Sequence, residues 1–152
     1  MKGPLVTFVC VMCAILFCGV ADTVAQKQAK KEAVVWPADG IKWLDMRDGP
    51  PGILYANLWG HLDKGAYGAL IKLPAGMKNP LHTHSSDLKI VVLSGTFLYI
   101  PEDGTEQRLG PGSYLFEPGG TRHLSGTGDD GPCEVFQESS GKFDFVPAEP
   151  PK

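Results

Sequence analysis

The chain has 152 residues, 43% of them hydrophobic and 20% charged, which favours one folded domain and excludes a disordered chain. Its formal charge of −3 and the lack of a basic stripe in the sequence argue against nucleic acid as a partner. The 19 glycines and 13 prolines indicate frequent turns, and therefore many short strands rather than long helices.

The first segment is predicted to be a secretory signal peptide covering residues 1–25. Lys2 supplies a positive charge, and an uncharged, mostly apolar run follows at residues 5–20. Small residues then favour cleavage after Ala25 or, alternatively, after Ala21. The run is short for a membrane span, so cleavage is preferred to an uncleaved anchor. The sequence thus predicts an exported protein, periplasmic or secreted, with no membrane attachment after cleavage.

Cysteine use predicts a fold without an internal disulfide. Three of the four cysteines fall in the signal segment, so the mature chain keeps only Cys133. Cys133 is interpreted either as a reactive thiol or soft metal ligand, or as a small buried residue of a strand, and the second interpretation is preferred. The fold must therefore be stabilised by packing.

After a polar lead-in at residues 26–40, the sequence predicts a single domain at residues 41–147 and a C-terminal tail at 148–152. Short apolar runs alternate with turn residues across this domain, and helical periodicity is missing after residue 33. The expected strands are 41–46, 53–59, 67–73, 82–93, 96–100, 107–109, 113–116, 133–139 and 143–146. The dipeptide at 103–104, Asp-Gly, is a strong hairpin signal. The predicted fold class is all-β, a small antiparallel β-barrel or jelly roll.

Three of the four histidines form an ordered pattern. His82 and His84 are separated by one residue, so on an extended strand their side chains point to the same face. Two imidazoles from one strand can then converge on one metal ion, with Thr83 facing away. Taken alone, such a pair is also compatible with surface or packing histidines.

The sequence around these histidines resembles the two motifs of the cupin superfamily. Residues 76–95 read glycine, five residues, His-x-His and a closing glycine, and residues 112–123 read glycine, five residues, Pro-Gly-Gly, two residues and histidine. The resemblance covers about residues 54–140. It implies a cupin jelly roll, a double-stranded β-helix, that holds one metal ion on His82, His84 and His123. The stretch from residue 59 to 95 is also similar to exported cupins of unknown function that resemble the zinc-binding cupin domains of bacterial anti-sigma factors.

The fourth metal ligand departs from the cupin pattern. The spacing puts Leu88 where cupins carry a glutamate ligand. Asp87 is one position early and would face the wrong side of a regular strand, although a β-bulge could turn it inward. The fourth ligand is therefore Asp87 or water. Glu117 is expected at the rim of the site, so Asp87 and Glu117 are the candidate catalytic bases. His61 is read as a loop residue or as an outer partner of the site.

Three neutral imidazoles suit one divalent transition metal, namely Zn, Fe(II), Mn, Ni or Cu, and not Mg or Ca. Resemblance to three-histidine cupin dioxygenases implies an enzyme, a metal-dependent dioxygenase or a related isomerase, that acts on a chelating small molecule. Resemblance to anti-sigma cupins implies instead a non-catalytic periplasmic protein that binds a metal or a ligand. A cupin that has lost its metal is a third interpretation, which the three histidines disfavour. A homodimer that exchanges an edge strand at residues 34–36 is expected by analogy.

Overall fold

The computed structural model describes residues 32–47 and 50–149, so the predicted signal peptide at residues 1–25 lies outside the described residues. The described residues from Val35 onward form one compact unit. The described residues contain one short 3-10 turn, η1 (Ala38–Gly40), and eleven strands. The strands are β1 (Leu44–Asp45), β2 (Leu54–Gly60), β3 (Tyr67–Leu73), β4 (Lys78–Thr83), β5 (Leu88–Ser94), β6 (Phe97–Pro101), β7 (Gln107–Leu109), β8 (Tyr114–Glu117), β9 (His123–Thr127), β10 (Cys133–Ser139) and β11 (Val146–Pro147). In this part of the chain no helix is long and apolar enough to cross a membrane.

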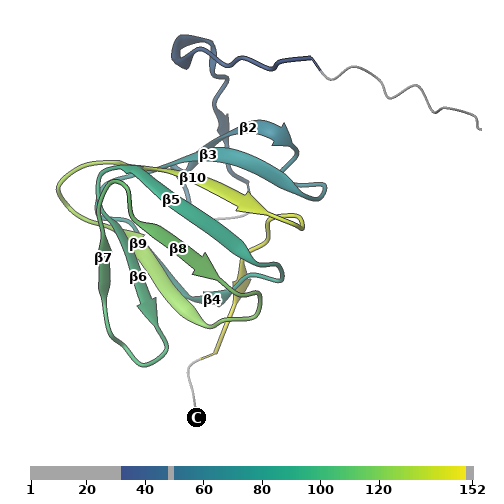
Figure 1. The fold of residues 1–152 in the computed structure, drawn as a ribbon. Helices are drawn as coiled ribbons and strands as arrows, with labels where there is room; N and C mark the ends of the chain where they lie inside the picture. The colour runs from purple at the N-terminus through teal and green to yellow at the C-terminus, as the bar shows by residue number, and fades with distance from the viewer. Residues whose placement is uncertain (1–31, 48–49, 150–152) are drawn as a thin grey trace, which may run out of the picture. The chain divides into compact units, whose positions relative to one another are not determined.

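The strands form two antiparallel sheets, which confirms the all-β jelly-roll prediction (Figure 1). The larger sheet has the order β1-β2-β3-β10-β5-β8, and the smaller sheet has the order β11-β4-β9-β6-β7. Strand β10 lies between β3 and β5 and pairs with both, so a strand from the end of the domain closes the centre of the larger sheet.

Alternation of side chains explains how this sheet builds the core. In β10 the residues at alternate positions, from Cys133 to Ser139, are buried, and those between them are less buried. Successive side chains of a strand point to opposite faces, so one face of β10 packs inward. The buried apolar cluster includes Tyr55, Tyr67, Ala69, Ile71, Leu73, Ile90, Val92, Phe97, Cys133 and Val135.

Position 95, which closes the first histidine motif, requires a glycine because of its backbone conformation and its close neighbours. Its φ is +72°, in the left-handed region that favours glycine, and it makes the turn between β5 and β6. A Cβ atom there would lie 2.4 Å from the carbonyl oxygen of Pro132 and 2.8 Å from the Cα of Cys133. The motif glycine therefore allows two segments of backbone to approach closely.

The prediction of one strand at residues 82–93 is wrong. The chain leaves β4 after Thr83 and begins β5 at Leu88, and these two strands belong to different sheets. Side chains supply the hydrogen bonds in the break, because Asp144 accepts the backbone N–H of Ser85 at 2.8 Å and Asp87 accepts that of Gly119 at 2.8 Å. These bonds replace a strand ladder and allow the chain to change sheets.

Other element boundaries also differ from the prediction. Strand β9 was not predicted, although it carries His123. Only Val146 of the predicted strand at 143–146 is in a strand, and of the predicted strand at 41–46 only Leu44–Asp45 is. Residues 34–36, predicted as an exchanged edge, belong to no strand here, and Trp36 is half exposed. Except for β9, which lies at the centre of the smaller sheet, these segments are short or lie at sheet edges, where local patterns are weakest.

Candidate metal centre

The structure brings His82, His84 and His123 together. Their ligand nitrogens all lie within 4.8 Å of one another, and all three side chains are buried. His82 in β4 is the direct cross-strand partner of His123 in β9, and the ring centroids are 4.1 Å apart. His84 lies one residue beyond β4, and its ring centroid is 5.0 Å from that of His82. Two neighbouring strands of one sheet thus position the group.

The outer nitrogen of each ring contacts a backbone carbonyl. Nδ1 of His82 donates to the oxygen of Pro80 at 2.7 Å, and Nδ1 of His123 donates to that of Thr121 at 3.2 Å. Nδ1 of His84 donates to the carbonyl oxygen of Asp144 at 2.5 Å. A proton on each Nδ1 leaves a lone pair on each Nε2, and such outer contacts orient metal-binding imidazoles. The donor set therefore fits one transition metal ion.

Burial keeps His82 and His84 in the neutral form that binds metals. It lowers the pKa of His82 to about 4, and the neighbouring His123 acts in the same direction. Burial also lowers the pKa of His84 below its ordinary value. At neutral pH neither ring needs to lose a proton before it can bind a metal ion.

Residues 143–145, called here the C-terminal strap, cover one side of the centre. Phe145 stacks on His82 with ring centroids 4.1 Å apart and an interplanar angle of 18°, and Phe143 lies 5.2 Å from His84. Asp144 holds the strap in place, because its carboxylate accepts both the N–H and the hydroxyl of Ser85. The sequence pattern predicted only a strand at residues 143–146. Two aromatic residues separated by one position were the available signal for a site wall.

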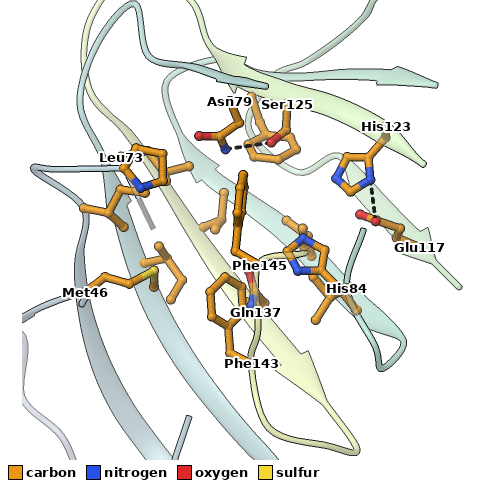
Figure 2. Close-up of a pocket in the computed structure, with 17 residues that line it drawn as sticks. Met46, Leu73, Asn79, His84, Glu117, His123, Ser125, Gln137, Phe143 and Phe145 are labelled. Atoms are coloured by element: carbon orange, nitrogen blue, oxygen red, sulfur yellow. Dashed lines mark hydrogen bonds and ion pairs between the residues drawn. The ribbon is translucent and has the colours of Figure 1, made fainter. Parts of the chain in front are cut away.

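The centre borders a cavity with about 540 Å³ of empty space, including the part that opens to solvent. His84 and His123 line it, together with the two strap phenylalanines (Figure 2). The remaining walls are mainly apolar, with Glu117, Asn79, Ser125 and Gln137 as polar lining groups. None of the described lining residues is a lysine or an arginine. Mainly apolar walls with a few polar groups are the character of a small-molecule site.

The structure separates the two carboxylates that were predicted as bases. Asp87 is exposed, and its carboxylate accepts the backbone N–H of Gly119, so it closes a turn and lies outside the histidine group. Glu117 at the end of β8 is only 2% exposed, and its Oε1 lies 2.8 Å from Nδ1 of His123 (Figure 2). Of the two, Glu117 is the carboxylate at the centre.

The two remaining sequence candidates lie away from the histidine group. Nδ1 of His61 accepts the backbone N–H of Asp63 at 3.3 Å in a partly exposed loop. Cys133 is fully buried in the core, and burial raises the pKa of its thiol to about 11. His61 is therefore a loop residue and Cys133 a core residue, and neither belongs to the histidine group.

Comparisons with known proteins agree with this fold. The family described as the ChrR cupin-like domain matches residues 31–139. The dimethylsulfoniopropionate lyase DddQ of Ruegeria pomeroyi is 33% identical over 60 residues, which are 40% of this chain and 30% of the lyase. The chain therefore matches less than a third of the length of that relative.

Solved structures of similar fold come from several kinds of protein. The polyketide cyclase RemF of Streptomyces resistomycificus matches with a TM-score of 0.64 at 18% identity, over 78% of this chain and 87% of the cyclase. DddQ matches with a TM-score of 0.58 at 21% identity, over 75% of this chain and 64% of the lyase. A protein of unknown function with a cupin-like fold from Ralstonia eutropha matches with a TM-score of 0.61 at 25% identity, over 78% and 79% of the two chains.

Proposed function

Because the chain belongs to the family of ChrR cupin-like domains, we propose that it is a metal-dependent cupin enzyme that acts on a small organic molecule. The observation that carries the proposal is the group of three buried imidazoles beside a largely apolar cavity. Three protein ligands leave coordination positions open for a substrate oxygen, as in catalytic rather than structural metal sites. Bound there, a divalent metal ion polarises that oxygen as a Lewis acid.

The lining residues indicate which substrates fit. Since no described lining residue is cationic, a substrate carboxylate or enolate finds its positive partner only at the metal centre. The rings of Phe143 and Phe145 and the aliphatic walls accept an apolar group, and aromatic faces also attract an onium group. Dimethylsulfoniopropionate, the substrate named for the related lyase, carries one carboxylate and one sulfonium group.

The reaction class that we favour is a redox-neutral elimination or isomerisation. The 33% identity to a lyase over 60 residues supports this class over oxygen-dependent cleavage. A metal-dependent dioxygenase, which the three-histidine set also suits, is the alternative reaction of the same centre.

Elemental analysis and a small substrate panel test the proposal. Purified protein, stripped with chelator and reloaded in turn with Zn, Fe(II), Mn, Ni or Cu, is given dimethylsulfoniopropionate, a β-diketone and a catechol. We expect about one metal ion per chain and turnover of a carboxylate substrate without oxygen uptake, both lost in His82→Ala and kept in His61→Ala. Oxygen uptake would identify a dioxygenase instead.

A second candidate function is a non-catalytic metal- or ligand-binding module. The match to the ChrR cupin-like family favours it, because that match covers most of the described domain. Tight zinc binding without turnover of any panel substrate would favour this module over the enzyme.

We also propose that the protein is exported and forms a homodimer. The signal-like segment at residues 1–25 supports export, and the exposed side chains of Val35 and Trp36 support an added edge contact. Detection of the chain only in the cytoplasmic fraction would contradict export. A monomer at micromolar concentration in gel filtration would contradict the dimer.

A further inference from the structure

We propose that Glu117 is a positioning residue of the metal centre that acts through His123. Its carboxylate lies 2.8 Å from the outer nitrogen of that imidazole and supplies the negative charge that stabilises a bound cation. The inference rests on the metal binding proposed above and does not depend on which substrate is used.

The surroundings of Glu117 are unusual for a carboxylate. The side chain is 2% exposed, whereas glutamates are rarely fully buried unless they are paired. Its Oε1 has no aligned hydrogen-bond donor among the described residues, because the ring N–H of His123 points more directly at the carbonyl of Thr121, 3.2 Å away. The short contact is the 2.8 Å approach of Oε1 to Nδ1 of His123. A buried charge in this position is incompletely compensated in the metal-free chain.

A metal ion on the other nitrogen of His123 supplies the missing compensation. Binding at Nε2 withdraws electron density from the ring, which makes Nδ1–H a stronger donor toward a carboxylate than toward a neutral carbonyl. The carboxylate in turn makes the ring a better metal ligand and fixes its orientation. Carboxylate and cation thus stabilise each other through one imidazole.

Charge balance supports the same role. The three imidazoles bring no charge of their own when neutral, and none of the described cavity-lining residues is cationic. A divalent ion there would be a buried, unbalanced charge, which is costly in a site of low dielectric constant. The buried carboxylate of Glu117 contacts His123, and its negative charge offsets half of that charge, whereas the carboxylate of Asp144, which also acts on His84, is bound to Ser85.

Strand pairing fixes the position of this carboxylate. Glu117 in β8 lies directly opposite Leu88 in β5, so both side chains project from the same face of the sheet, and both are buried. The contact with Nδ1 is made from β8.

The test measures zinc affinity and melting temperature in Glu117→Gln, with Glu106→Gln as the matched control. Glu106 is an exposed carboxylate paired with Arg108, away from the histidine group. We expect Glu117→Gln to weaken zinc binding by about tenfold to a hundredfold, measured by competition with a chromophoric chelator. Its metal-free melting temperature should stay equal to or rise above that of the wild type, because a buried uncompensated charge has been removed. The rise in melting temperature on adding zinc should shrink, since that rise follows the affinity.

One further variant separates charge from side-chain length. Glu117→Asp keeps the negative charge on a shorter side chain and should regain part of the affinity lost in Glu117→Gln. Absorption spectra of the Co(II)-loaded forms should differ between Glu117→Gln and wild type, because His123 is held differently.

Three results would overturn the inference. The first is zinc affinity in Glu117→Gln within twofold of wild type, including the case in which turnover alone is lost, as expected of a base that touches substrate. The second is an equal fall of the metal-free and metal-bound melting temperatures, which would mark a purely structural role. The third is a wild-type protein that takes up no metal, which alone would also overturn the proposed function.

Discussion

His82 and His123 are direct cross-strand partners, and their buried rings lie with centroids 4.1 Å apart although 41 residues separate them in the chain. Because β4 pairs with β9, the sheet itself positions two of the three histidines of the metal centre. Ligands held by a hydrogen-bonded ladder are oriented before the metal arrives, so little ordering entropy is lost on binding.

Removal of a central imidazole should abolish stoichiometric metal binding. For His123→Ala we expect the affinity to fall by at least about a hundredfold, because a lost ligand costs more than a lost outer partner. Metal content of the purified protein measures this. His61→Ala serves as control, since its ring lies in a loop beside Asp63. Equal metal content in both variants would contradict the assignment.

Stability of the metal-free protein should fall in mild acid. The pKa of His82 in the folded chain is about 4, below its ordinary value of 6.5, so the unfolded chain binds the proton first as the pH falls. The stabilisation is complete above pH 6.5 and is lost as the pH falls toward 4. Each such histidine contributes a slope of at most about 1.4 kcal/mol per pH unit. The pKa of His84 is lowered in the same direction and should add to the effect.

Urea unfolding between pH 7.5 and 4.5, with chelator present, measures this slope. His82→Gln should flatten the curve, because its amide does not titrate in this window. A wild-type stability that is constant between pH 6.5 and 4.5 would contradict the depressed pKa of His82.

Loss of the aromatic ring at position 145 should destabilise the domain. Phe145 stacks on His82 and lines the cavity, so Phe145→Ala should lower the free energy of unfolding by about 1–3 kcal/mol. Phe116 is 48% exposed, and Phe116→Ala should change that energy by less than about 0.5 kcal/mol. Denaturant titration compares the two. An equal effect in both variants would mean that the strap does not pack on the centre.

The thiol of Cys133 should be unreactive in the native protein. Its side chain is fully buried, and burial raises its pKa to about 11, so very little thiolate exists at pH 8. A chromogenic disulfide reagent should modify it only after denaturation. Rapid labelling of the native chain at this position would contradict its place in the core.

Alanine at position 95 should be much worse than alanine at another turn glycine. Gly95 and Gly104 both have positive φ, +72° and +82°, so both substitutions strain the backbone by about 1 kcal/mol. Only at Gly95 would the new Cβ collide, 2.4 Å from the oxygen of Pro132, whereas nothing lies within 4 Å at Gly104. Thermal unfolding should therefore show a loss for Gly95→Ala that exceeds that for Gly104→Ala by about 2 kcal/mol or more. Equal losses would mean that the close approach is relieved at little cost.

The sequence by itself determined the fold class and the three histidines. Predicted strands at 67–73, 107–109 and 133–139 coincide with β3, β7 and β10, because side-chain alternation and glycine turns are local signals. The fixed spacings around His82, His84 and His123 are also local features of the sequence. They predict a shared site without knowledge of the contact between β4 and β9.

Tertiary structure alone decided where the chain changes sheets and which carboxylate reaches the centre. The bonds that end β4 come from Asp144, and the partner that holds Asp87 is Gly119, each more than 30 residues away. Glu117 reaches His123 across the short turn at residues 118–122, where the chain passes from β8 in one sheet to β9 in the other, and the local sequence does not specify how that turn places the carboxylate. Periodicity reports which face a side chain takes, whereas hydrogen-bond partners and charge contacts between distant segments exist only once the sheets have formed.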